Sequence, residues 1–439
     1  MQLRELEFEL PRRHELAPRA LIEHFRSEVL SRLSDGQRPI RFVVTETRSN
    51  SFFVELSVID FEDDVVRLPI PDIFEFLPRG FPKVDRFVSA LLIPTGIGAE
   101  IGGHSGDGNP VARLIAAASD DVITHPNVLN AADINEMTDN TLYVEGSIIS
   151  RLLMGQVGLG RVRSNRVSVL MDCHPDRYFN DAVVNAASSA RVTLGLNCRV
   201  HEMSELVETT ATLSKAGRAS ARVLNFDRLV RVVEQVRLES DAIALATRIH
   251  TPEGTQARYF SSEDHSVNPW GGAEAMLTHA LALAFGTPVA HAPMSPTRTV
   301  RDLDCGVVDP RKAPEALSIT YLHSVLKGLA RHPQVLPPGG GIGADSVSCL
   351  IVPDGVLGLP VLAALAQGIP VVVVTENKNL MRNDLRELFG AQAGVLNLVL
   401  DAQNYLEAAG LCSLLKSGVD VATVRRPIAR TSVERVLGP

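Results

Sequence analysis

The segment LLIPTGIGAEIGGHSGDGNPVARLIAAASDDVITHPNVLNAA, residues 91–132, decides the predicted fold of this chain. It begins with an apolar run and continues into glycine-rich sequence, a helix-like stretch from Pro110 and a second apolar run that ends before His125. A strand followed by glycines and a helix start is the layout in which backbone N–H groups and the helix dipole can hold an anion. We therefore predict a strand, an anion-binding loop at residues 94–109, a helix and a second strand. The alternative is that these glycines only make a structural turn with solvated polar side chains.

Short Val/Ile/Leu runs alternate with helix-like segments over the rest of the chain, up to about residue 390. Continuous apolar runs of this kind are typical of parallel strands that are covered by helices on both faces. Polar sequence of weak periodicity at residues 196–222 interrupts the alternation. The sequence therefore predicts an α/β protein with two doubly wound, Rossmann-like lobes of mostly parallel sheet, at residues 86–210 and 220–390, with a ligand cleft between them.

The two ends of the chain differ from this pattern. Residues 1–85 contain a strand, a helix and two partly alternating strands around Ser49-Asn50, so we predict a small N-terminal α+β unit. A stretch with two prolines and a glycine, residues 74–84, would link this unit to the lobes. Residues 391–439 are predicted as a C-terminal helical cover.

Composition limits the classes of partner. The 439 residues carry a formal net charge of −8, which opposes broad binding to nucleic acid or to an anionic membrane surface. No apolar run has signal-peptide character at the N-terminus or reaches the roughly 18 residues of a membrane span. The five cysteines include no CxxC pair, so neither a zinc knuckle nor a disulfide framework is indicated. We expect a cytoplasmic protein that binds a small molecule, with neither nucleic acid nor membrane as a partner and a homodimer as its default assembly.

The glycine-rich loop matches neither the dinucleotide-binding GxGxxG spacing nor a phosphate-binding GK[ST] loop. It carries two side chains suited to catalysis, His104 and Asp107. Histidine titrates near neutral pH, and a neighbouring carboxylate can orient it or share its proton. Ligand-binding candidates in the loop are Thr95, Gly96, Gly98, Gly102, Gly103 and Ser105.

Polar residues also follow the next two predicted strands. His125 ends one strand and Glu145 ends the next, and both are catalytic candidates. Asn127 and Asn130 follow His125 and are ligand-binding candidates. Because the carboxyl ends of neighbouring parallel strands meet at one sheet edge, we expect these residues to converge with the glycine-rich loop.

The second lobe contributes a polar cluster before a helix that we expect from Ala273. Its catalytic candidates are Glu263 and His265, and its ligand-binding candidates are Asn268, Trp270, Gly271 and Gly272. Further ligand-binding candidates, at predicted strand ends and turns, are His291, Arg311, Glu376 and Asn377. On the helix itself we expect Glu274 and His279 on different faces, with His279 packed in apolar surroundings.

A divalent metal ion would find ligands of the right type in this set. The catalytic candidates are all histidines and carboxylates, but no pair has a diagnostic spacing such as HExxH. We therefore predict a site without a metal and identify no cofactor.

Several of these motifs resemble a known family. Over about residues 88–380 the chain contains, in order, IPTGIGAEIGGHSGDGNPVARLIA, ITHPNVLNAA, LYVEG, EDHSVNPWGGAEAM, HAP, DPRKAPE and GIPVVVVTEN. Together they resemble the domain-of-unknown-function family 3326. The resemblance implies a shared fold and a shared site, and it names no substrate. The N-terminal unit lies outside it.

The sequence leaves two functions open. The first is an enzyme that binds a small carboxylated or phosphorylated metabolite between the lobes, with His104 or His125 as general base or acid and with Asp107, Glu145 or Glu263 assisting. Its reaction class, whether hydrolase, lyase, isomerase or transferase, is not distinguishable. The second is a non-catalytic ligand-binding or regulatory protein that uses the same cleft. The titratable residues at strand ends favour the enzyme, and the failed GxGxxG spacing disfavours a nicotinamide-dependent oxidoreductase.

Overall fold

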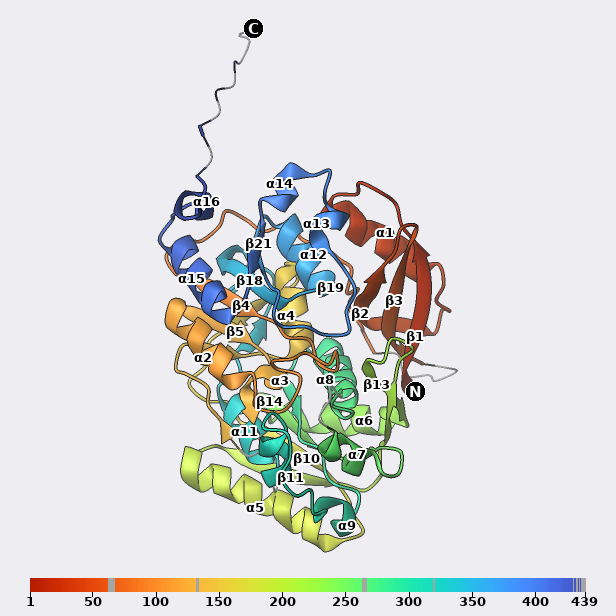
Figure 1. The fold of residues 1–439 in the computed structure, drawn as a ribbon. Coiled ribbons are helices and arrows are strands. Elements are labelled where there is room, and N and C mark those ends of the chain that lie inside the picture. The colour runs from red at the N-terminus through yellow and green to blue at the C-terminus, as the bar shows by residue number, and fades with distance from the viewer. Residues whose placement is uncertain are drawn as a thin grey trace.

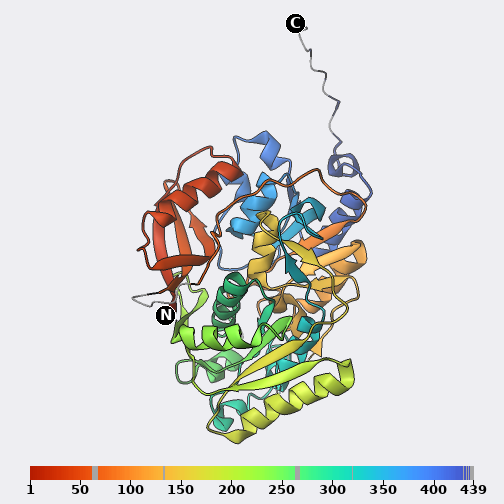
Figure 2. The same ribbon diagram turned by 180° about the vertical axis from the view of Figure 1, so that it is seen from behind.

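The computed structural model describes residues 1–61, 68–131, 134–262, 267–318, 320–428, 430–431, 433 and 435. Three large sheets organise these residues, with helices between and around them (Figure 1, Figure 2). Two of the sheets are parallel, and the third is mainly antiparallel and holds the N-terminal strands. The architecture is therefore the predicted α/β class with an N-terminal antiparallel unit.

The first parallel sheet has the strand order β21-β20-β18-β4-β5-β8, and every neighbouring pair is parallel. Numbered along the chain and read from β8, this is the order 3-2-1-4-5-6 of the Rossmann fold, which reverses between β4 and β18. The strands are β4 (Val88–Leu91), β5 (Asp121–Thr124), β8 (Thr141–Tyr143), β18 (Val347–Pro353), β20 (Val371–Val374) and β21 (Val399–Ala402). The glycine-rich loop leaves β4 at this reversal, where sheets of this type bind their ligands.

Helices cover both faces of this sheet. On one face α2 (Asn109–Ala118) and α15 (Tyr405–Lys416) pack together, and on the other α4 (Gly146–Leu153) packs with α12 (Leu359–Ala366) (Figure 1). Because the strands are buried from both sides, they are continuous apolar runs such as the four valines of β20.

The second parallel sheet has the order β11-β10-β14-β16. Its strands are β10 (Val167–Asp172), β11 (Cys198–Met203), β14 (Ala242–Ala246) and β16 (Val289–His291). The helices α5 (Arg177–Leu194) and α11 (Leu322–Ala330) pack together against it, and α8 (Gly271–Phe285) packs on β16.

The N-terminal unit forms the core of the antiparallel sheet. Its strands are β1 (Gln2–Pro11), β2 (Gln37–Thr47) and β3 (Ser51–Asp60), with α1 (Pro18–Leu30) packed on them through Phe25. Later segments extend the sheet at both edges to give β15-β12-β13-β1-β3-β2-β19. These added strands are β12 (Glu208–Leu213), β13 (Ala219–Leu224), β15 (Ile249–His250) and β19 (Leu357–Gly358). The buried helix α8 contacts β2 and β13 here, β16 in the second sheet and α4 beside the first, so the three sheets meet around it.

The predicted domain boundaries do not follow the sheets. The segment 196–222, which was interpreted as a break between lobes, contains β11 and most of the β12–β13 hairpin. The first sheet takes its strands from residues 88–143 and from 347–402, and the second sheet lies between them in the chain. The predicted C-terminal cover likewise contains the edge strand β21 beside its helices. Pairing between distant segments depends on tertiary packing, which local periodicity does not report.

The remaining elements mostly connect the sheets. They are α3 (Pro126–Leu129), β6 (Asn130–Ala131), β7 (Ile134–Asn135), β9 (Gly158–Gly160), α6 (Phe226–Val236), α7 (Thr255–Ser261), α9 (Arg298–Arg301), α10 (Ala313–Leu317), β17 (Gln334–Leu336), a 3₁₀ turn (Ala344–Ser346), α13 (Leu385–Leu388), α14 (Ala393–Leu396) and α16 (Val421–Val424). Among the described residues, no helix combines the length and the apolar character needed to cross a bilayer.

Candidate functional site

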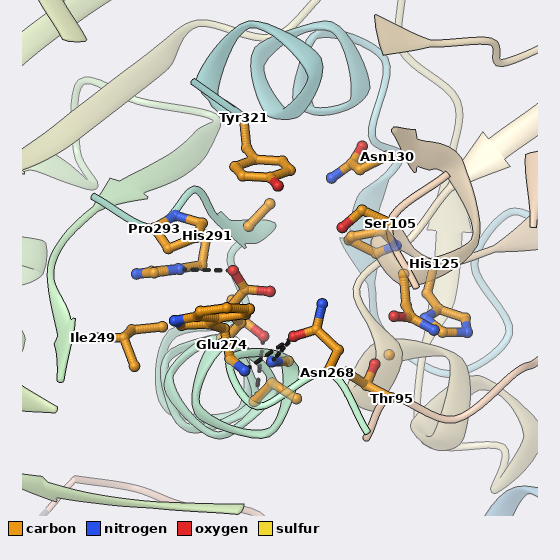
Figure 3. Close-up of a pocket in the computed structure, with 18 of the residues that line it drawn as sticks. Thr95, Ser105, His125, Asn130, Ile249, Asn268, Glu274, His291, Pro293 and Tyr321 are labelled. Carbon is orange, nitrogen blue, oxygen red and sulfur yellow. Dashed lines mark hydrogen bonds and ion pairs between the residues drawn. The ribbon is translucent and has the colours of Figure 1, made fainter. Parts of the chain in front are cut away.

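A cavity of about 330 Å³ lies between the carboxyl ends of the two parallel sheets. From the first sheet it is lined by Thr95 after β4, His125 after β5 and Glu145 after β8. From the second sheet it is lined by Ala246 at the end of β14 and by His291 at the end of β16. Residues of α8 and β2 complete the wall, and Figure 3 shows side chains from several of these elements around one space. A concave site with a few convergent polar groups is typical of small-molecule binding.

Glu145 and His279 form a carboxylate–imidazole pair in the wall of this cavity. Glu145 caps the N-terminus of α4: its Oε2 accepts the N–H of Ser147 at 2.9 Å and that of Ile148 at 3.3 Å. Its Oε1 lies 2.6 Å from Nδ1 of His279 and accepts the hydroxyl of Thr278 at 3.2 Å. Burial alone would raise the pKa of Glu145, but the charge of His279 and these hydrogen bonds outweigh burial and lower it. The carboxylate therefore stays ionised at neutral pH and lies in close ion-pair contact with Nδ1, although this contact lacks the alignment of a hydrogen bond. Nε2 of His279 is left for a ligand.

A second histidine fixes the backbone of this pair. The N–H of Glu145 donates to Nε2 of His332 at 3.0 Å, and Nδ1 of His332 lies 2.6 Å from the carbonyl oxygen of Pro333. Burial lowers the pKa of His332 to about 4, so the ring is neutral and its proton lies on Nδ1. His332 therefore positions the end of β8 and stays uncharged.

Arg151, on α4, also lines the cavity. Its Nε and Nη1 are buried and have no hydrogen-bond partner among the described residues. Burial lowers the pKa of this guanidinium, and the charge of Glu145 opposes that effect. Buried charged groups without a partner destabilise the folded protein, because they lose hydrogen bonds to water and form none in their place.

Glu315 lines another part of the cavity, at the end of a chain of hydrogen bonds. Its Oε1 accepts from Nδ2 of Asn268 at 2.6 Å and from the hydroxyl of Ser105 at 3.2 Å. Its Oε2 accepts the hydroxyl of Tyr259 at 2.5 Å, and the same hydroxyl lies 2.8 Å from Nδ1 of His104. Burial raises the pKa of Glu315 to about 7 in spite of these donors. Glu315 can therefore hold or release a proton near neutral pH.

The start of α8 presents a second imidazole–carboxylate contact. Nδ1 of His291 lies 3.5 Å from Oε1 of Glu274 (Figure 3). Asn268 caps this end of the helix, because its Oδ1 accepts the N–H of Trp270 at 3.0 Å and that of Gly271 at 3.2 Å. The chain itself therefore occupies the N–H of Gly271, one of the amides predicted to hold an anion, together with the N–H of Trp270.

Two arginines of the antiparallel sheet line the cavity with their charges already balanced. Nη2 of Arg41 lies 3.1 Å from Oε2 of Glu5, and Nη2 of Arg218 lies 3.0 Å from Oε1 of the same residue. Arg218 also forms an ion pair with Glu55. Neither arginine therefore needs a ligand as its counter-ion.

Comparison with known proteins agrees with the predicted resemblance. Residues 88–425 match the family model described as a protein of unknown function, DUF3326. The chain belongs to the DUF3326 family. A relative from Synechococcus sp., named an uncharacterised lipoprotein, is 34% identical over 344 residues, which cover 76% of this chain and 92% of the relative. No solved structure matches the chain. The match extends beyond the predicted limit of residue 380, and the cytoplasmic location stays a prediction.

The cavity of this DUF3326 protein brings together only part of the predicted site. The predicted residues that line it are Thr95, Ser105, His125, Asn127, Asn130, Glu145, Asn268, Trp270, Gly271 and His291. The predicted residues outside its lining are Gly96, Gly98, Gly102, Gly103, His104, Asp107, Gly272, Arg311, Glu376 and Asn377. Glu263 and His265 lie outside the described residues.

The glycines of the loop and of the α8 start have a packing role. Gly96 has a φ of +76°, and a Cβ there would lie 2.8 Å from Cβ of Ala219 on β13. A Cβ on Gly103 would lie 2.0 Å from the carbonyl oxygen of Ala99. At the start of α8, a Cβ on Gly272 would lie 2.3 Å from the carbonyl carbon of Ala219. These distances favour a structural role for the glycines over anion binding. Because glycine has no Cβ, the loop, β13 and α8 can approach one another closely.

Two other predicted ligand-binding residues hold loops in place. Asn377 accepts the N–H of Ile101 at 3.0 Å and donates to the carbonyl oxygen of Ile101 at 3.0 Å. Arg311 donates to Asp309 at 2.7 Å and to Glu100 at 3.0 Å, so the predicted anion clamp already binds two carboxylates.

The proton-transfer candidates of the predicted first lobe, His104, Asp107 and His125, do not have the environments that the sequence predicted. Nε2 of His125 accepts the N–H of Ile93 at 3.2 Å, and burial lowers the pKa of His125 to about 4. The neutral ring therefore carries its proton on Nδ1 and acts as a hydrogen-bond donor, not as a base. His104 is hydrogen-bonded to the hydroxyl of Tyr259, and neither residue lines the cavity. Burial raises the pKa of Asp107 to about 7, but this carboxyl also lies outside the lining.

The metal-ligand set considered from the sequence is dispersed. His125 and Glu145 line the cavity, whereas His104 and Asp107 do not. In the part of the chain that the structure describes, no three His, Cys, Asp or Glu side chains are grouped to hold a metal ion.

Sequence reasoning missed three residues whose side chains suit catalysis or ligand binding, namely His279, Arg151 and Glu315. His279 was expected to be packed, but it lines the cavity together with Glu274 because α8 borders that space along more than one face. The available signal was a titratable side chain inside the otherwise apolar run MLTHALAL. For Glu315, the motif DPRKAPE drew attention to Arg311 instead.

Proposed function

We propose that this DUF3326 protein is an enzyme that moves a proton to or from a small anionic metabolite bound in the cavity. The Glu145–His279 pair carries this proposal. A buried carboxylate in contact with one nitrogen of an imidazole orients the ring and leaves the other nitrogen facing the cavity, which prepares histidine for general acid–base catalysis. His279 takes the role that the sequence assigned to His104 or His125.

Glu315 supports the proposal as a second proton-carrying group. Its pKa of about 7 lets it exchange a proton at the pH of the cell. Reactions that remove one proton and deliver another, such as eliminations and isomerisations, use two groups held in different environments. Glu145 keeps its charge beside His279, whereas Glu315 titrates near neutrality, so the two carboxyls have separate roles.

The alternative function is ligand binding without turnover. His125 and Asn268 favour it, because both line the cavity and both are held by backbone contacts, as in a rigid binding wall.

Isotope exchange distinguishes the two functions. Panels of small carboxylates and phosphates are first screened for an increase in the melting temperature of the protein. Each stabilising compound is then incubated with the protein in D₂O and followed by NMR and mass spectrometry. We expect at least one such compound to gain deuterium or to be converted, with a rate about 100-fold lower in His279→Gln.

The control variant is His14→Gln, because His14 is exposed and is not among the lining residues. It should behave as the wild type. Compounds that stabilise the wild type and are never exchanged or converted would refute the enzyme and support the binding protein. Turnover that survives in His279→Gln would refute the role of His279.

A further inference from the structure

Arg151 is a cation in the cavity wall that forms no ion pair with the described residues. Its Nε and Nη1 have no hydrogen-bond partner among the described residues. The other arginines of the lining have carboxylate partners: Arg41 and Arg218 share Glu5, and Arg301 pairs with Asp302. Arg151 is partly exposed, but two of its three guanidinium nitrogens are buried without a partner, a cost that a bound anion would offset.

Glu145, the carboxylate whose charge acts on Arg151, does not form an ion pair with it. Both carboxylate oxygens of Glu145 are already used. Oε1 is held by His279 and Thr278, and Oε2 is held by Ser147 and Ile148. An anion that enters the cavity is therefore the remaining partner for Arg151.

The surroundings favour a carboxylate over a phosphate as this anion. A phosphate monoester carries about −1.5 to −2 charges at neutral pH, and proteins commonly hold it on free backbone N–H groups at helix N-termini or glycine-rich loops. Here the N–H groups at the start of α4 bind Glu145, and those at the start of α8 bind Asn268. Three carboxyl groups of the lining, Glu145, Glu274 and Glu315, would also repel a dianion.

We propose that Arg151 binds the carboxylate group of the ligand, and that the substrate class of the cavity is therefore small carboxylic acids. One guanidinium matches one carboxylate in charge and in hydrogen-bonding geometry. The proposal rests on the proposed function for placing the substrate in this cavity, and it names the chemical class and the residue that anchors it.

Trp270 reports occupancy of the cavity without a label. It is the single tryptophan of the chain and it lines the cavity, so its fluorescence reports on this site alone. The probes are the monoanions acetate, propionate and lactate, compared with inorganic phosphate and glycerol phosphate at matched ionic strength. We expect the carboxylates to change the fluorescence and raise the melting temperature. Arg151→Gln should weaken carboxylate binding at least about tenfold, and the exposed control Arg163→Gln should not.

A second variant tests the unpaired charge without any ligand. Arg151→Met keeps most of the aliphatic contact of the side chain and removes the guanidinium. Because that charge is unpaired, the variant should melt a few degrees above the ligand-free wild type. Carboxylates should then stabilise it no further.

Each remaining outcome decides against part of the proposal. Binding of phosphates that depends on Arg151 would overturn the carboxylate class. Equal carboxylate binding by wild type and Arg151→Gln would overturn Arg151 as the anchor, and so would a lower melting temperature in Arg151→Met. If no carboxylate bound the wild type, both the carboxylate class and the anchor would be overturned. His279→Gln separates this proposal from the proposed function: carboxylates that bind wild type and His279→Gln alike, with no turnover by either, support the anchor and refute the enzyme.

Discussion

The carboxyl group of Glu315 makes the stability of the folded protein depend on pH. Burial raises its pKa to about 7 from an ordinary value of 4.5. Between these two values the folded protein retains a proton that the unfolded chain releases, so the free energy of unfolding falls as the pH rises from about 4.5 to about 7. The difference between the two pKa values corresponds to roughly 3 kcal/mol. Because the side chain is partly exposed, we expect about 2 kcal/mol.

Glu315→Gln removes this dependence, because the amide stays neutral at every pH. Its oxygen can still accept from Asn268 and Ser105. The bond from Tyr259 favours the ionised carboxylate, and its effect is already contained in the pKa of about 7. Relative to the wild type, the variant should therefore gain about 2 kcal/mol in unfolding free energy between pH 5 and pH 8.

Urea unfolding followed by circular dichroism measures this difference at pH 5, 6, 7 and 8 and constant ionic strength. Glu253→Gln, at an exposed carboxylate, is the matched control and should follow the wild type. If wild type and Glu315→Gln lose the same stability over this range, the carboxyl ionises in the folded protein as it does in the unfolded chain, and its assignment as a proton carrier fails.

Further predictions concern packing and buried hydrogen bonds, and urea unfolding measures them all. Gly272→Ala would place a Cβ 2.3 Å from the backbone of Ala219 and should lower the unfolding free energy by about 3 kcal/mol. Gly410→Ala, in α15 with no atom within 4 Å of the new Cβ, should raise it by about 0.5–1 kcal/mol, and similar effects of the two changes would contradict the packing role. Asn377→Ala leaves both backbone groups of Ile101 unpaired and should cost about 2–4 kcal/mol, so a loss below about 1 kcal/mol would show that water replaces the amide.

Local sequence patterns predicted the parts of the fold that depend on local physics. The strand β4, the loop and α2 follow from an apolar run, glycines and a proline near the helix start. His125 and Glu145 were predicted to converge because the ends of parallel strands meet at one sheet edge, and both line the cavity. The β12–β13 hairpin was not predicted, because β13 joins its sheet by pairing with β1, a strand distant in the sequence.

The roles within the site could not be predicted, because each depends on a partner distant in the sequence. Glu145 meets His279 only in the folded chain, and the pKa of Glu315 is raised to about 7 only because folding buries its carboxyl group. Arg151 was overlooked for a related reason: its interest lies in the absence of a partner in the described structure, which no sequence pattern shows.

The antiparallel sheet joins residues on both sides of the DUF3326 boundary at residue 88. β1 pairs with β13 through Leu3 and Val223, and β2 contributes Ile40 to Val43 to the cavity wall. A fragment that started at residue 88 would leave one edge of β13 unpaired and one side of the cavity open. Conversely, exchanging the N-terminal unit alone would reshape that wall while Glu145 and His279 stayed in place. Under the proposed function, recombination could therefore change the shape of the ligand site while leaving the residues proposed to move the proton unchanged.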